Sequence, residues 1–180
     1  MNLKQLFNKA KKTVSMTVKQ SIEYIKKLFK IKTTLTNKDF KPGTILTFNY
    51  NAKDKTQTYD KTPLVLVLRR NNIHTLAINF HWAPTSMRVF LVNIILEKNK
   101  KNIEKGLPLD FSYKELKPLL KRIGFAPVIR LYINSRISSK GVVIPSSDLM
   151  HAARLKSETF TQGKMSAEQL YKKALKASKK

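Results

Sequence analysis

The stretch from Thr62 to Pro84, TPLVLVLRRNNIHTLAINFHWAP, constrains the fold of this chain more than any other. Leu64 to Leu68 is an unbroken run of β-favouring apolar residues, and Ile73 to Phe80 is a second run that alternates more loosely. The Arg-Arg-Asn-Asn between them favours a tight turn, because asparagine tolerates a positive φ angle. The pattern therefore predicts a β-hairpin. Its first strand is apolar on both faces, so we expect both faces to be covered.

The flanking patterns predict an α+β fold: a small, mostly antiparallel β unit built on this central hairpin and covered by helices. Pro42-Gly43 is a turn signal, after which the first strand begins. The other expected elements, in chain order, are a strand over 44–50, a polar loop over 51–60, helices over 84–98 and 112–123 joined by a charged connector over 99–105, a helix or strand over 127–137, a strand over 141–145, a brief helix over 148–155 and a last helix capped by Ser166 and Gln169.

Residues 2 to about 30 step through apolar positions by three and four, with lysines between them, and predict one long amphipathic helix. Three interpretations stay open: a stripe that packs on a neighbour in an assembly, a membrane-surface helix, or an arm that faces DNA. We expect three parts: an N-terminal helical arm over 1–32, a globular α+β domain over 42–160, and a basic helical tail over 161–180.

The charge of the chain is its outlying compositional feature. Lysines and arginines number 36 against 11 acidic residues, a formal net charge of +25. Such a chain attracts polyanions: nucleic acid first, then an anionic membrane surface, then an acidic protein. Lysine outweighs arginine, which favours loose phosphate contact over base reading. No apolar run approaches the ~18 residues of a membrane span, which disfavours a membrane protein.

Motifs for catalysis are scarce. Cysteine is absent, which excludes disulfides and thiolate chemistry. His74, His81 and His151 have no metal-ligand spacing, and a lone histidine of this kind is usually structural. Asp54 and Asp60 flank a loop and are interpreted as turn residues. Because the chain also has no glycine-rich phosphate loop and no paired-carboxylate motif, we expect a non-enzyme without cofactor, metal or small-molecule substrate.

The basic residues are better organised, and they are the candidate nucleic-acid or partner-binding positions. Arg122, Arg130 and Arg136 would lie near one another if their segment were helical. Aromatic residues between the basic runs could stack on exposed bases, or fill the core. The alternative for the whole set is a solvated face. The candidate residues are Lys53, Lys55, Arg69, Arg70, Lys100, Lys101, Arg122, Arg130, Arg136, Lys172, Lys173 and Lys176.

Residues 42 to 160 contain the stretches PGTILTFNYNAKDK, TYDKTPLVLVL and LAINFHWAPTSMR, followed by YINSR and VVIP. In these stretches the chain resembles a family of small virion-associated proteins of large contractile-tailed bacteriophages. A doubled proline of the family pattern is Ala83-Pro84 here. The matching positions are Pro42, Gly43, Phe48, Tyr50, Lys53, Tyr59, Asp60, Pro63, Leu64, Val65, Asn79, His81, Pro84 and Arg88.

Members of that family are labelled DNA end protectors or structural proteins. The resemblance implies a non-enzymatic virion protein, located in the virion and in the host cytoplasm during assembly. Its expected partners are other virion subunits, in multiple copies of a symmetric assembly, and double-stranded DNA bound without sequence specificity. Two rival hypotheses are a purely protein–protein connector of neck, tail or baseplate, and a DNA-processing accessory enzyme.

Overall fold

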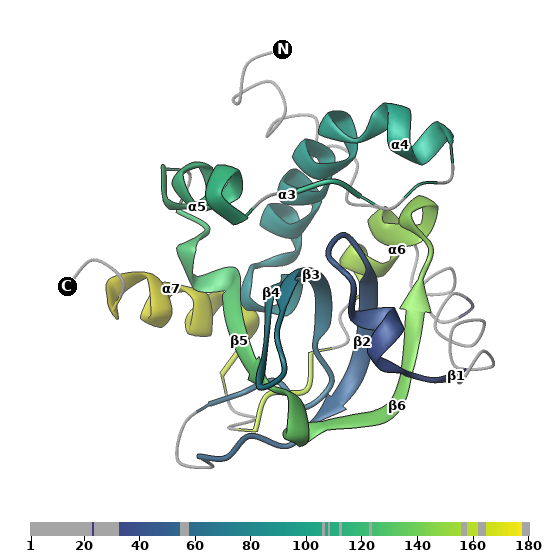
Figure 1. Cartoon of the computed structure of the whole chain (residues 1–180). Helices are drawn as coiled ribbons and strands as arrows, with labels where there is room; N and C mark the ends of the chain where they lie inside the picture. Colours follow the sequence, from purple (N-terminus) through teal and green to yellow (C-terminus); the bar gives the residue numbers. More distant parts are fainter. Residues whose placement is uncertain are drawn as a thin grey trace.

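The computed structural model describes residues 23, 33–54, 58–105, 107, 109–111, 113–122, 124–155, 158–161 and 165–177. Apart from Glu23, the predicted N-terminal helix lies outside the described residues, as does Lys55. Within the described residues the fold is mixed α+β, as predicted: one antiparallel sheet with helices packed on it (Figure 1).

The sheet has six strands in the order β1-β6-β2-β3-β4-β5, and every neighbouring pair is antiparallel. Strands β2 to β5 form a meander, and β6 returns to pair with β2. Short 3-10 helices connect several elements: η1 (Asn37–Phe40), η2 (Phe80–Trp82), η3 (Ala126–Val128), η4 (Asn134–Arg136) and η5 (Ser146–Asp148). The strands are β1 (Thr33–Thr34), β2 (Ile45–Tyr50), β3 (Leu64–Arg70), β4 (His74–Asn79), β5 (Ile129–Ile133) and β6 (Ile137–Ile144).

The predicted hairpin is confirmed, with β3 and β4 paired so that Leu66 lies opposite Ile78. Its turn does not use a positive φ angle, which among the described residues occurs only at glycines. Instead, Asn71 Oδ1 accepts the backbone N–H groups of Ile73 and His74 at 2.9 and 2.6 Å. The turn asparagine therefore acts through its side chain rather than through its backbone freedom.

Both faces of β3 are covered, as its continuous apolar run predicts. Leu64, Leu66 and Leu68 belong to the main core beneath the helices. Val65 and Val67 point to a smaller core. That smaller core also contains Leu35, Phe40, Leu46, Phe48, Ala77 and Tyr132. Leu76 of β4 is half-buried. It lies opposite Arg69, after an irregularity in the pairing between Val67 and Arg69.

The helices cover the main core. Figure 1 shows α5 and α7 on the side where β5 forms the sheet edge, and α6 beside the end of β6. Helix α3 is the most deeply embedded, since it carries buried residues around most of its circumference. The helices are α3 (Thr85–Lys98), α4 (Lys100–Glu104), α5 (Tyr113–Arg122), α6 (Leu149–Arg154) and α7 (Ala167–Ala177).

Three sequence expectations need correction or extension. Residues 129–133 form strand β5, because their β-branched and aromatic side chains complete the ladder with β4. The connector over 99–105 contains a short helix, α4. Helix α7 begins at the predicted Ser166–Gln169 capping box, but it packs against the fold instead of projecting as an arm. Its Leu170 and Tyr171 are buried.

Candidate functional site

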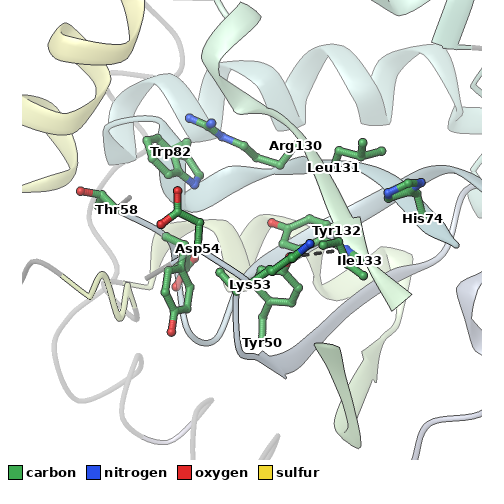
Figure 2. Close-up of a pocket in the computed structure, with 13 residues that line it drawn as sticks. Tyr50, Lys53, Asp54, Thr58, His74, Trp82, Arg130, Leu131, Tyr132 and Ile133 are labelled. Carbon is green, nitrogen blue, oxygen red and sulfur yellow. Dashed lines mark hydrogen bonds between the residues drawn. The ribbon is translucent and has the colours of Figure 1, made fainter. Parts of the chain in front are cut away.

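A pocket of about 370 Å³ opens between the β2–β3 loop and strand β5. Next to the pocket, η4 connects β5 to β6 across the end of β2. There Tyr50 pairs with Ile137, and the Asn51 N–H donates to the backbone oxygen of Arg136. Figure 2 shows Trp82 and Arg130 on one side of the opening, with Tyr50 and Lys53 on the other.

Arg130 is held over the ring of Trp82. Its guanidinium carbon lies 3.4 Å from the ring centroid, a close cation–π contact. Its Nε is buried and has no hydrogen-bond partner among the residues that the structure describes. Burial lowers the pKa of Arg130 to about 10, which still leaves the side chain cationic at neutral pH. The pocket therefore contains a fixed positive charge with unused donor capacity.

Tyr132 supplies the second unsatisfied group. Its ring makes edge contacts with Tyr50 and Phe48, at centroid distances of 4.9 and 5.3 Å. The residue is only 4% exposed, and its hydroxyl makes no hydrogen bond of ordinary geometry within the described part of the chain, although the nearby side chain of Asn79 partly opposes the rise of its pKa. Burial, and to a lesser extent the carboxylate of Asp60, raise the pKa of Tyr132 well above its ordinary value. The hydroxyl thus stays protonated and can donate or accept.

A buried polar network lies beneath the pocket. Asp60 is 2% exposed, and its Oδ2 lies 2.7 Å from His81 Nδ1. Asn79 donates to the same oxygen, and the Thr159 N–H donates to Oδ1. Burial opposes ionisation of Asp60, but the hydrogen bond and charge of His81, with these further donors, lower its pKa below the ordinary value. Asp60 also accepts the N–H of Thr62, so its turn role is one part of a larger one.

Arg88 forms a second buried network next to the first. The side chain is fully buried and donates to the backbone oxygens of Ala83, Leu155 and His81. It is also paired with the carboxylate of Glu158. Burial lowers the pKa of Arg88, and the charge of Glu158 partly offsets that effect. The network joins the exit of the hairpin, α3 and the segment after α6.

His81 takes part in both networks, through its ring and through its backbone oxygen. His81 is structural, as predicted, and its partner Asp60 lies 21 positions earlier in the chain. No spacing rule could have found this pair, because the hairpin alone brings the two residues together.

The predicted basic residues do not form one patch. Lys53 and Arg130 meet at the pocket, and Arg136 lies just beyond it on η4. Arg70 is folded over the ring of Phe40, at 4.2 Å, while Arg69 is exposed. Lys100 and Lys101 are exposed on α4. The condition for the expected cluster of Arg122, Arg130 and Arg136, one helix through all three, is not met: Arg122 ends α5, Arg130 lies in β5 and Arg136 lies in η4.

Exposed lysines lie on both α5 and α7, two helices that each pack against η3. Both helices are amphipathic, and the Tyr171 hydroxyl of α7 donates to the backbone of Gly124, just after α5. Leu116 and Leu120 of α5 are buried, which turns its lysines outward. We call this set the α5–α7 lysine surface; it consists of the exposed residues Lys114, Lys117, Lys121, Lys172, Lys173 and Lys176. The three α5 lysines were not predicted, although their spacing along a predicted helix could have indicated them.

Comparisons with protein-family models, with curated proteins and with solved structures found no match. Within the described part of the chain, no group of three or more histidine, aspartate and glutamate side chains is placed to hold a metal ion. No helix among the described residues has the length and apolar character needed to cross a membrane.

Proposed function

We propose that this protein is a non-enzymatic structural protein of a tailed-phage virion that binds genomic double-stranded DNA without reading its sequence. The virion context rests on the family resemblance of residues 42–160. The DNA contact rests on the charge of the chain and on where its charged groups lie.

The α5–α7 lysine surface is the observation that carries the proposal. Its lysines lie opposite buried apolar residues, so they cannot turn inward. Several of the few acidic side chains are paired with other groups of the fold. Asp60 pairs with His81, Glu158 pairs with Arg88, and Asp39 accepts hydrogen bonds from the backbone N–H and the hydroxyl of Thr36. Within the part of the chain that the structure describes, Lys172 is the one lysine of this surface that forms an ion pair with a described carboxylate, the exposed Glu168. The surface is therefore largely unneutralised.

Charge neutralisation is the proposed mechanism. Each lysine that meets a phosphate releases condensed counterions from the duplex, so affinity falls steeply as salt rises. Lysines on the outer faces of two short helices have no fixed geometry for base edges, and flexible ammonium groups suit phosphates of any sequence. Binding of this kind positions or coats DNA and needs no catalytic group.

The connector hypothesis has one specific observation in its favour. Ile73 and Leu131 are large apolar side chains that remain 63% and 58% exposed. Leu131 lies on β5 and Ile73 lies in the turn just before β4, beside the β5 edge, a place where another virion subunit could dock. On that hypothesis the lysine surface meets an acidic ring of protein instead of DNA.

The decisive experiment is a salt titration of binding to a random-sequence duplex, followed by fluorescence anisotropy. We expect log K to fall linearly with log salt between about 50 and 200 mM, with a slope near −0.9 for each phosphate contact. Changing Lys114, Lys117 and Lys121 together to glutamine should flatten the slope by up to about 3 for every sequence tested.

The matched control removes three exposed lysines from elsewhere, Lys38, Lys41 and Lys140, which lie on η1 or near it and on β6. Equal losses in the two triple variants would contradict a localised surface. Absence of duplex binding at low salt, together with tight binding to an acidic virion protein, would refute the DNA half and favour the connector.

A further inference from the structure

We propose that the pocket between the β2–β3 loop and β5 binds one unpaired nucleotide of a DNA strand, with its base inside and its phosphate toward Lys53 and Arg130. This inference rests on the proposed DNA-binding function, and it adds to the lysine surface a second site of different chemistry. It concerns frayed, flipped or terminal nucleotides, which a duplex-coating surface cannot recognise.

The first argument is that the pocket is built for a ligand with both an aromatic and a polar part. Its volume of about 370 Å³ falls in the usual range for small-ligand sites. Tyr50, Tyr59, Trp82 and Tyr132 contribute aromatic surface to its walls. Base–aromatic contacts tolerate any sequence, because every base has a π face. Such a site agrees with binding that does not read sequence.

The second argument is the pair of unsatisfied polar groups that the pocket holds. The Tyr132 hydroxyl and Arg130 Nε are both buried without a hydrogen-bond partner among the described residues. Buried polar groups are nearly always satisfied, so an orphaned group in a pocket wall indicates a missing ligand or water. Neither atom is accessible to solvent in the free protein, so a base edge satisfies the hydroxyl, and a phosphate oxygen the guanidinium, once the side chains that cover them move aside. Lys53 is exposed on the opposite side of the opening and can meet a phosphate that lies across it.

The third argument separates a nucleotide from an acidic peptide. Asp54 and Asp60 both line the pocket. Their negative charge disfavours an acidic side chain at the same wall, since like charges close together in a partly buried site repel. The same carboxylates repel a phosphate, so only the uncharged base of a nucleotide can lie against that wall.

The chain carries its own reporter for the test. Trp82 is its sole tryptophan, and it lies in the pocket in contact with Arg130 and with the ring of Phe160. A base that enters the pocket, or a phosphate that engages Arg130, changes the surroundings of the indole directly. Quenching of intrinsic tryptophan emission therefore reports on this pocket, whereas anisotropy of labelled DNA reports on binding anywhere.

The experiment titrates the full chain with a ten-nucleotide single strand, with an abasic strand of the same length, and with a closed duplex hairpin. We expect saturable quenching with the base-bearing strand, and little with the abasic strand even where anisotropy shows it bound. Tyr132→Phe and Arg130→Gln should each weaken the quenching affinity for the base-bearing strand about tenfold. Arg136→Gln is the matched control, because it removes the same charge from an exposed position next to β5.

Tyr132→Phe separates binding from folding. Because the hydroxyl makes no hydrogen bond of ordinary geometry with the described residues, its removal should leave the melting temperature nearly unchanged or higher while affinity falls. Equal quenching by the abasic and base-bearing strands would overturn the inference, as would equal effects of Arg130→Gln and Arg136→Gln. Quenching by a poly-glutamate peptide but not by DNA would replace the nucleotide with an acidic peptide.

The two proposals fail in distinguishable ways. DNA binding by anisotropy without any Trp82 response would overturn the pocket inference and leave the lysine surface standing. Absence of DNA binding in both assays would overturn both.

Discussion

Breaking the buried Arg88–Glu158 pair should destabilise the protein far more than breaking an exposed pair. Arg88→Met removes a fully buried guanidinium and leaves the backbone oxygens of Ala83, Leu155 and His81 without their donor. It also strands the carboxylate of Glu158, which is 17% exposed. Removal of one partner of a buried pair costs roughly 3–5 kcal/mol. Because Glu158 can recover some hydration, we expect the lower end, about 3 kcal/mol.

The matched control is Lys172→Met, which breaks the pair with Glu168 at 3.0 Å, where the two side chains are 70% and 63% exposed. Exposed pairs of this kind contribute at most about 1 kcal/mol. Glu158→Gln is an intermediate case: it keeps an oxygen for Arg88 but removes the compensating charge, so its cost should be about 1–2 kcal/mol.

Thermal unfolding followed by circular dichroism, with urea titration for the free energy, measures all three variants. For a chain of this size, 1 kcal/mol corresponds to about 2–4 °C in melting temperature, so Arg88→Met should melt roughly 6–12 °C below the wild type. An Arg88→Met protein that melts with Lys172→Met, within about 2 °C of the wild type, would refute the reasoning. It would mean that the three carbonyls and the carboxylate find other partners at little cost.

Three further predictions follow from the core, from the Asp60 network and from a close backbone approach. Leu66→Asp should leave no folded protein in circular dichroism, because Leu66 is fully buried and an unpaired buried charge costs several kcal/mol. Asp60 has a lowered pKa, so its contribution to stability is complete above its ordinary value of 3.8 and is lost as pH falls through the folded value. Asp60→Asn should therefore lower the urea midpoint at pH 7 and remove part of the acid-induced loss; an unchanged pH profile would contradict this. Gly43→Ala should cost at least about 2 kcal/mol by urea titration, since φ is +85° and a Cβ atom would lie 1.9 Å from Leu109 O; a wild-type midpoint would argue against it.

Much of the architecture is determined by local sequence. The apolar runs around Arg-Arg-Asn-Asn specify the hairpin and the burial of both faces of β3. Pro84 marks the start of α3, and Ser166 with Gln169 marks the start of α7. These features are readable because their physical causes, side-chain period and capping, act within a few residues. The excess of lysine over acid is likewise a property of the sequence alone, and it motivates the DNA proposal without the fold.

Only the tertiary structure decides which distant residues meet. Whether residues 129–133 became helix or strand depended on the free edge of β4, because the β-branched and aromatic residues there suit either state until a partner strand is present. Tyr132 and Arg130 then reach the pocket from β5, while Tyr50 comes from the end of β2 and Lys53 from the loop that follows it. Asp60 and His81 pair only because the hairpin folds, and Arg88 finds Glu158 across 70 residues. Such contacts form only when the strands pair and α3 packs on the sheet, so no local pattern in the sequence encodes them.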